Sequence, residues 1–141
     1  MEPATKYPAS ISILFVEDDE IVLGLQAAVL TARFPDVVIH TAVDGRLGLE
    51  VFKAHAHDIV LTDINMPDMC GVEMSEKIRS IKPDTKFIAI TGKSGEFCGN
   101  EKRILQNSNG TNFEFDHVIV KPVDLSKLFS AIDQCICKIK H

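Results

Sequence analysis

The chain has 141 residues, of which 45% are hydrophobic and 25% are charged, and its formal net charge is −5. A chain of this length folds as one domain with a core of its own, and this balance of residues excludes a disordered or collagen-like chain. The mild acidity argues against nucleic acid as a direct partner, because phosphate binding requires a basic face. The 4 cysteines lack the Cys-x-x-Cys spacing of metal sites and are predicted to be free thiols.

The N-terminal segment predicts neither a secretory signal nor a membrane anchor. Residues 1–10 contain Pro3 and Pro8 and few apolar side chains, which is typical of a flexible arm. No apolar stretch approaches the length of a membrane span. We therefore expect a cytoplasmic domain over residues 11–141, with no membrane partner.

Apolar runs of strand length recur along the chain, at residues 11–16, 37–42, 58–62, 86–90 and 117–120. Most are rich in Val and Ile and lack clean alternation, which is typical of strands buried on both faces of a parallel sheet. Segments with helical periodicity lie between them, and parallel strands require crossover connections. The sequence therefore predicts a doubly wound α/β fold in which a strand and a helix alternate five times.

The helices are predicted from apolar stripes with helical spacing, two of which follow candidate N-caps at Asp19 and Asp124. The stripes are Ile21, Leu25, Ala28 and Ala32; Leu47, Val51 and Ala54; Met74, Ile78 and Ile81; and Leu125, Leu128, Phe129, Ile132 and Ile136. The connection at about residues 92–116 is rich in Gly and Asn. It is predicted to be long and partly mobile, with a helix at about residues 101–106.

Two further groups of residues have ordinary structural explanations. His55 and His57 are two positions apart and do not share a helix face, so surface positions are expected. Phe113 and Phe115 flank Glu114 and are predicted to pack in the core rather than to form an exposed partner site.

Polar side chains follow four of the five apolar runs. They are Glu17, Asp18 and Asp19 after the first, Asp63 after the third, Thr91 after the fourth and Lys121 after the fifth. In an open parallel sheet these positions share one edge, where ligands bind. Clustered carboxylates repel one another, and their hard oxygens select Mg²⁺, Mn²⁺ or Ca²⁺ rather than zinc. The set predicts a phosphoryl site with an Asp nucleophile, although each motif alone also suits a helix cap or a loop.

Four segments together resemble the response-regulator receiver domains of two-component signalling. They are ILFVEDD at 13–19, LTDINMP at 61–67 with Gly71, IAIT at 88–91 and VKP at 120–122. The resemblance extends from about residue 11 to residue 136. It implies a flavodoxin-like fold whose five parallel strands lie in the order 2-1-3-4-5.

The resemblance also implies a role for each site residue. Asp63 is implied to be the phosphoacceptor, with Thr91 and Lys121 binding the phosphoryl group. Mg²⁺ is implied to be held by Asp18, by Glu17 through water, by Asp63 and by the backbone carbonyl of Asn65. The bond from Lys121 to Pro122 is usually cis in this family. Such a domain catalyses only its own phosphorylation and dephosphorylation, and Asn65 and Lys93 are expected to set the lifetime of the phosphoryl group.

Three departures from the family pattern bear on signal transmission. Val118 stands where an aromatic residue is usual, Gly92 replaces a common Ala, and the interval from Thr91 to Lys121 is longer than usual. The output face implied by the family consists of the fourth helix, the fifth strand and the fifth helix. We therefore expect unusual signal transmission in this chain.

The implied phosphoryl donor is a histidine kinase or a histidine phosphotransfer protein, and the implied target is another protein. One alternative is a degenerate receiver that acts as a phosphorylation-independent adaptor, although no acceptor, acid or lysine is missing. Another is a haloacid-dehalogenase-like phosphatase, which needs a second Asp where this chain has Asn65. A stand-alone protein, an excised domain of a hybrid kinase and a homodimer all remain open.

Overall fold

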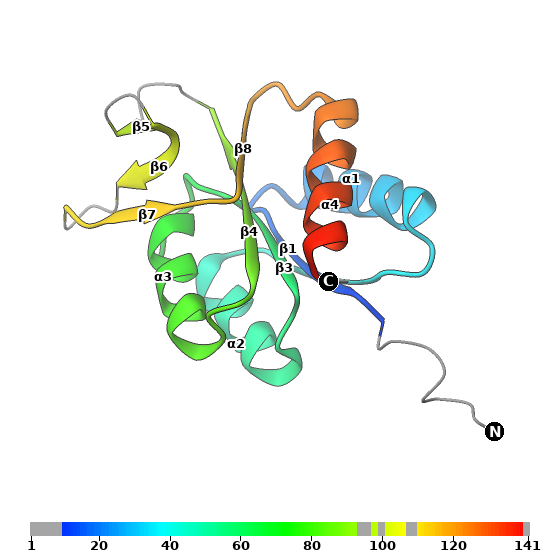
Figure 1. Ribbon diagram of the computed structural model, residues 1–141, viewed down its shortest axis with the longest axis horizontal. Helices are drawn as coiled ribbons and strands as arrows, with labels where there is room; N and C mark the ends of the chain where they lie inside the picture. The colour runs from blue at the N-terminus through cyan, green and yellow to red at the C-terminus, as the bar shows by residue number, and fades with distance from the viewer. Residues whose placement is uncertain (1–9, 93–96, 99–100, 107–109, 140–141) are drawn as a thin grey trace.

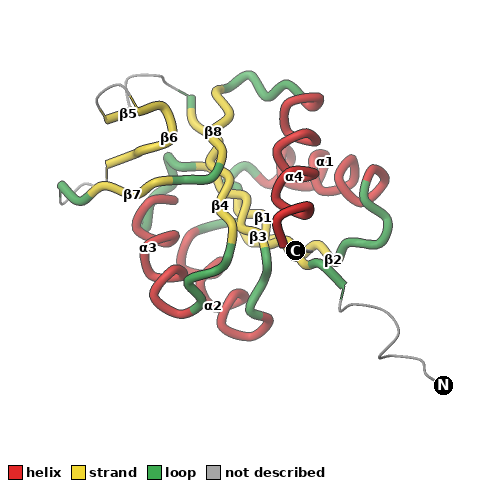
Figure 2. Tube along the Cα trace, in the orientation of Figure 1, coloured by secondary structure: helices red, strands yellow, loops and turns green. Residues whose placement is uncertain are grey.

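The computed structural model describes residues 10–92, 97–98, 101–106 and 110–139, and these form a central sheet flanked by helices (Figures 1 and 2). The predicted flexible arm, apart from Ser10, and the predicted role of Lys93 lie outside the described residues. The helices are α1 (Glu20–Arg33), α2 (Gly45–His55), α3 (Gly71–Ile81) and α4 (Leu125–Ile139). Within the described ranges, no helix has the length and apolar character needed to span a bilayer.

The central sheet contains five parallel strands in the order β2-β1-β3-β4-β8. They are β1 (Ser12–Val16), β2 (Val38–Ala42), β3 (Ile59–Asp63), β4 (Lys86–Thr91) and β8 (His117–Val120). This is the predicted fold and strand order, with β8 as the fifth parallel strand. All residues of β3 are buried, as expected for a strand covered on both faces.

The two faces of the sheet carry separate cores, because successive side chains of a strand point to opposite faces. Leu14 and Val16 of β1 pack in the core that includes Phe52 of α2 and Met74 of α3. Ile13 and Phe15 pack instead with the helices on the other face, where Leu23, Leu30, Leu128 and Ile132 are buried. Figure 1 shows α2 and α3 on one side of the sheet and α1 and α4 on the other. The sheet is thereby a buried middle layer.

The crossover from β4 to β8 differs from the prediction. Its described residues form no helix, but a three-stranded antiparallel sheet of β5 (Phe97–Cys98), β6 (Glu101–Gln106) and β7 (Asn112–Glu114). The predicted helix at residues 101–106 is therefore wrong, as is the fivefold alternation of strand and helix. Leu105 lies opposite Phe113 in this sheet, and both are buried beside Phe87 and Phe115. The predicted core positions of Phe113 and Phe115 are confirmed.

Two helices bury a different face from the one predicted. Ile21 and Leu25 of α1 are 75% and 65% exposed, whereas Leu23 and Leu30 face the core. In α2, Leu47 is exposed, and the buried residues are Gly45, Gly48 and Phe52. A Cβ added to Gly48 would lie 2.9 Å from Cγ2 of Val16, so α2 contacts β1 through a residue without a side chain. Helical periodicity of apolar side chains does not predict a contact that is made through glycine.

Both candidate N-caps are confirmed. Oδ1 of Asp19 accepts hydrogen bonds from the N–H groups of Ile21 and Val22, at 3.0 and 3.2 Å. Oδ1 of Asp124 accepts them from Ser126 and Lys127, at 2.9 and 3.4 Å. These carboxylates satisfy N–H groups that have no partner inside the helix. The bond from Lys121 to Pro122 is cis, as the resemblance implied.

Candidate functional site

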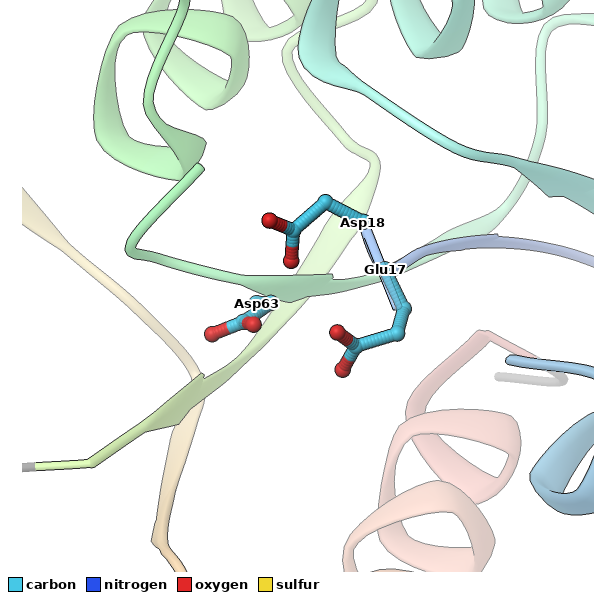
Figure 3. Close-up of side chains that lie close together, drawn as sticks. All are labelled: Glu17, Asp18 and Asp63. Carbon is cyan, nitrogen blue, oxygen red and sulfur yellow. The ribbon is translucent and has the colours of Figure 1, made fainter. Parts of the chain in front are cut away.

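Three carboxylates meet at the carboxyl edge of the sheet (Figure 3). Glu17 and Asp18 follow the last residue of β1, and Asp63 is the last residue of β3. Because β1 and β3 are adjacent parallel strands, the residues at their ends lie side by side. Each of the three carboxylates offers an oxygen, and these oxygens all lie within 4.8 Å of one another.

Asp63 is the most constrained of the three. Its residue is 3% exposed, and its Oδ2 accepts a hydrogen bond from Nζ of Lys121 at 3.1 Å. Its Oδ1 is buried and has no hydrogen-bond partner among the described residues. A buried carboxylate oxygen without a partner is costly, so this atom is suited to binding a cation or an incoming electrophile.

Burial and neighbouring charges shift the pKa values of Glu17 and Lys121. Burial, reinforced by the nearby charge of Asp63, raises the pKa of Glu17 to about 7. The hydrogen bond that Glu17 accepts from the Asp19 N–H at 3.1 Å acts in the opposite direction and lowers this pKa. Burial would lower the pKa of Lys121, but the hydrogen bond to Asp63 and the carboxylate charges raise it overall. Among the described residues, the three carboxylates of the cluster outnumber the Lys121 ammonium that faces them.

Thr91 and Asn65 complete the predicted set. Thr91 is the last residue of β4 and is fully buried, and its carbonyl accepts the Lys121 N–H at 2.7 Å. Asn65 follows Asp63 by two residues and is exposed. The structure thus brings Glu17, Asp18, Asp63 and Lys121 together through their side chains and joins Thr91 to Lys121 through the backbone. The part of the Asn65 carbonyl in metal binding stays a prediction.

One further residue, Thr62, supports the site and was not predicted from the sequence. Thr62 is fully buried, and its hydroxyl donates a hydrogen bond to the backbone carbonyl of Asp63 at 2.8 Å. Its signal in the sequence is a hydroxyl residue inside an apolar run, directly before the acidic residue. The bond restrains the peptide group that follows the Asp63 Cα, next to the reactive side chain.

The donor set suits a hard divalent cation. It consists of carboxylate oxygens, one of them buried without a partner, and no His or Cys belongs to this described cluster. Oxygen ligands of this kind hold Mg²⁺, which keeps several waters in its coordination shell. The exposed Asp18 leaves one side of the cluster open to such waters and to a substrate.

A parallel sheet of this order, with acidic residues at its carboxyl edge, defines a flavodoxin-like α/β domain with an anionic site at the expected position. The family profile of the response regulator receiver domain matches residues 13–133. The chain belongs to this family and is a receiver domain of two-component signalling.

Relatives of known name support the same assignment. The chain is 27% identical over 128 residues to the cell cycle response regulator CtrA of Brucella ovis, covering 91% of this chain and 51% of CtrA. It is 34% identical over 89 residues to the autoinducer 1 sensor kinase/phosphatase LuxN of Vibrio harveyi, covering 62% of this chain and 10% of LuxN. The chain thus spans about half of one relative and about a tenth of the other.

Solved structures show the same architecture. A CheY-like receiver domain from Methanospirillum hungatei has a TM-score of 0.73 and 27% identity, and the alignment covers 92% of this chain and 96% of that chain. The response regulator TrrA from Thermotoga maritima, solved in complex with Mg²⁺ and BeF, has a TM-score of 0.72 and 26% identity. That alignment covers 89% of this chain and 98% of TrrA.

Proposed function

We propose that this receiver domain accepts a phosphoryl group on Asp63 from a phosphohistidine. The observation that carries the proposal is the state of the two Asp63 oxygens. Oδ2 is held by Lys121, while the buried Oδ1 has no partner among the described residues and lies in the acidic cluster. In the transfer, a bond forms from Asp63 oxygen to phosphorus, and the bond from phosphorus to imidazole nitrogen breaks. The electron pair leaves with the donor imidazole, which takes up a proton.

Mg²⁺ fits this proposal as the cation of the acidic cluster. Glu17, Asp18 and Asp63 would hold it, together with the Asn65 carbonyl, and when bound it supplies neutralisation of the phosphoryl oxygens. Lys121 supplies a second positive charge, since its ammonium already lies 3.1 Å from Asp63. We assign the Thr91 hydroxyl to binding a phosphoryl oxygen, supported by its position at the end of the adjacent strand β4.

The exposed face of α1 supports a protein as the phosphoryl donor. Ile21 and Leu25 lie one turn apart and are both largely exposed, in the helix that begins two residues after Asp18. Adjacent exposed apolar side chains next to a reactive site suit a protein interface. We assign this face to a histidine kinase or a histidine phosphotransfer protein, in keeping with the resemblance to part of the LuxN sensor kinase. The target of the phosphorylated domain is assigned as a further protein.

Incubation with acetyl phosphate and Mg²⁺, followed by intact-mass measurement, tests the proposal. We expect one phosphoryl adduct on the wild-type chain, none without Mg²⁺ and none on Asp63→Asn. The matched control is Asp58→Asn, because Asp58 directly precedes β3, at the end opposite Asp63, and pairs with Lys82 instead. An adduct that survives Asp63→Asn, or a folded wild-type chain without any adduct, contradicts the proposal; the second result favours the adaptor.

A further inference from the structure

Three histidines gather at the end of the sheet opposite the acidic site. His40 lies in β2, His55 is the last residue of α2, and His57 lies in the short connection before β3. The ring centroids of His40 and His55 are 4.2 Å apart, those of His40 and His57 are 5.0 Å apart, and those of His55 and His57 are 5.7 Å apart. The expected surface position of His57 is wrong, because this residue is fully buried.

Two nitrogens of this cluster point at each other. Nδ1 of His40 lies 2.8 Å from Nε2 of His57, so the two rings share one proton in a hydrogen bond. The His57 ring is packed against Phe52, and the His57 carbonyl accepts a hydrogen bond from the Thr85 hydroxyl at 2.9 Å. Nδ1 of His57 has no hydrogen-bond partner among the described residues. The buried His57 ring is thus held in place, with its Nε2 directed at the half-buried His40.

The surroundings of His40 and His57 disfavour the charged form of their rings. Burial, then the neighbouring His40 and His55, lowers the pKa of His57 to about 4; Asp58 opposes the shift and Lys82 adds to it. Burial and His55 also lower the pKa of His40. A neutral imidazole is the form that binds metal ions, so the lowered pKa values of His40 and His57 favour their metal-binding form.

We propose that His40, His55 and His57 form a binding site for a borderline divalent transition metal, with Zn²⁺ as the type ion. The Nδ1 of His40 and the Nε2 of His57 would be the first two ligands. Bonds from zinc to nitrogen of about 2.0–2.1 Å place two tetrahedral ligands about 3.4 Å apart, so this pair has to open by roughly half an ångström. The metal replaces the hydrogen bond between the two rings. The proton of that hydrogen bond then moves to the other nitrogen of the ring that carried it.

His55 is the third ligand of the proposed site. Its ring now lies against His40 at an interplanar angle of 32°, so the three rings do not yet converge on one point. The residue is exposed and ends α2, which allows its ring to turn about the side-chain torsions. Water completes the four-coordinate shell on the exposed side. The exposed His55 would therefore complete the set of three protein ligands.

The chemistry of the ligands separates this site from the acidic one. Imidazole suits zinc, copper and nickel, whereas carboxylate oxygens suit magnesium. The nearby carboxylate of Asp58 is already engaged, because its Oδ2 accepts the Ser12 N–H at 3.0 Å and its Oδ1 lies 3.4 Å from Nζ of Lys82. The two ends of the sheet would thus select different metals.

Titration of Zn²⁺ into the untagged full chain, in excess Mg²⁺ and in competition with a chromophoric chelator, tests the proposal. We expect one zinc per chain, and a loss of at least about 10–100-fold in affinity for His40→Gln and for His55→Gln. His57 is left intact, because its replacement would disturb the core. Circular dichroism verifies that both variants fold.

Two control variants show whether the zinc binds at the three histidines. His117→Gln removes a histidine at the start of β8, outside the cluster, and is expected to bind zinc like the wild type. Asp63→Asn is expected to do the same, and Co²⁺ in place of zinc should give the visible bands of a tetrahedral nitrogen site. The proposal is overturned if the wild type binds no zinc, if His40→Gln keeps its affinity, or if Asp63→Asn loses it.

Discussion

Gly71, the first residue of α3, packs so closely against Asp63 that an added Cβ would lie 2.4 Å from the Asp63 carbonyl oxygen. The Gly71 N–H also donates a hydrogen bond to the Ile64 carbonyl at 2.9 Å. The connection between β3 and α3 therefore folds back onto the residue that carries the reactive carboxylate. Any side chain at position 71 has to displace backbone rather than a flexible neighbour.

Replacing Gly71 with Ala is expected to lower both stability and phosphorylation. Making room for the methyl group should cost about 1–3 kcal/mol of unfolding free energy and shift the Asp63 backbone. Urea unfolding and the rate of adduct formation with acetyl phosphate measure the two effects. The control is Gly24→Ala in α1, where an added Cβ would meet no described atom within 4 Å apart from its chain neighbours and its own helix backbone, and where Ala should stabilise by about 0.5–1 kcal/mol. Equal behaviour of the two variants would contradict the close approach.

Mg²⁺ is expected to stabilise the folded chain through the acidic cluster. A ligand that binds the folded state alone adds about 2.7 kcal/mol when its concentration is a hundred times its Kd. Thermal unfolding with Mg²⁺ and with EDTA should therefore show a higher Tm with the ion. Asp18→Asn keeps the shape of an exposed ligand but removes its charge, and it should lose most of this increase. A full Mg²⁺ response in Asp18→Asn would place the ion elsewhere.

Arg79 is expected to attach the three-stranded sheet to α3. Its guanidinium carbon lies 3.8 Å from the centre of the Phe113 ring, and its Nη2 donates a hydrogen bond to the Glu114 carbonyl at 3.0 Å. Arg79→Ala should cost about 1–2 kcal/mol and speed hydrogen exchange in β7. Lys77→Ala, at an exposed position of the same helix, should change neither. Unchanged exchange in β7 of Arg79→Ala would show that other contacts hold this strand.

The two cysteines of α4 are expected to differ in reactivity. Burial, reinforced by the charge of Asp116, raises the pKa of Cys135 to about 12, while Cys137 is exposed. Iodoacetamide at pH 8.5 should label Cys137 in the native chain and Cys135 only after denaturation, as peptide mass spectrometry would show. Because the folded pKa of Cys135 exceeds its ordinary value of 9.0, its contribution to stability is complete below pH 9 and is lost as the pH rises towards 12. Early labelling of Cys135 would be inconsistent with its burial.

The strands and the site were predictable for related physical reasons. Strands buried on both faces must be apolar throughout, so the apolar run in the sequence begins and ends with the strand. The bounds of every predicted strand lie within one residue of those observed. The topology then brings the residues after β1 and β3 to one edge without further information. Glu17, Asp18 and Asp63 were therefore placed together from their positions in the chain alone.

The parts that sequence analysis missed depend on contacts between distant residues. In α1, apolar side chains cover more than the buried face, so periodicity did not distinguish exposed Ile21 from buried Leu23. Leu105 lies in a strand because it pairs with Phe113, and a short polar segment does not display such a partner. The burial of His57 likewise depends on His40 and Phe52, which the chain brings from other elements.

Direct pairing of β4 with β8, rather than the segment that joins them, positions Thr91 and Lys121 at the reactive edge. Thr91 lies opposite Val120 in this ladder, and the next residue, Lys121, donates its N–H to the Thr91 carbonyl. The spacing between the hydroxyl and the ammonium is thus set by the register of two neighbouring strands. The described strands of the connecting segment cover Phe87 with Phe113. Changes in the described strands β6 and β7 would therefore alter the cover of Phe87 while the register of β4 and β8 stays in place.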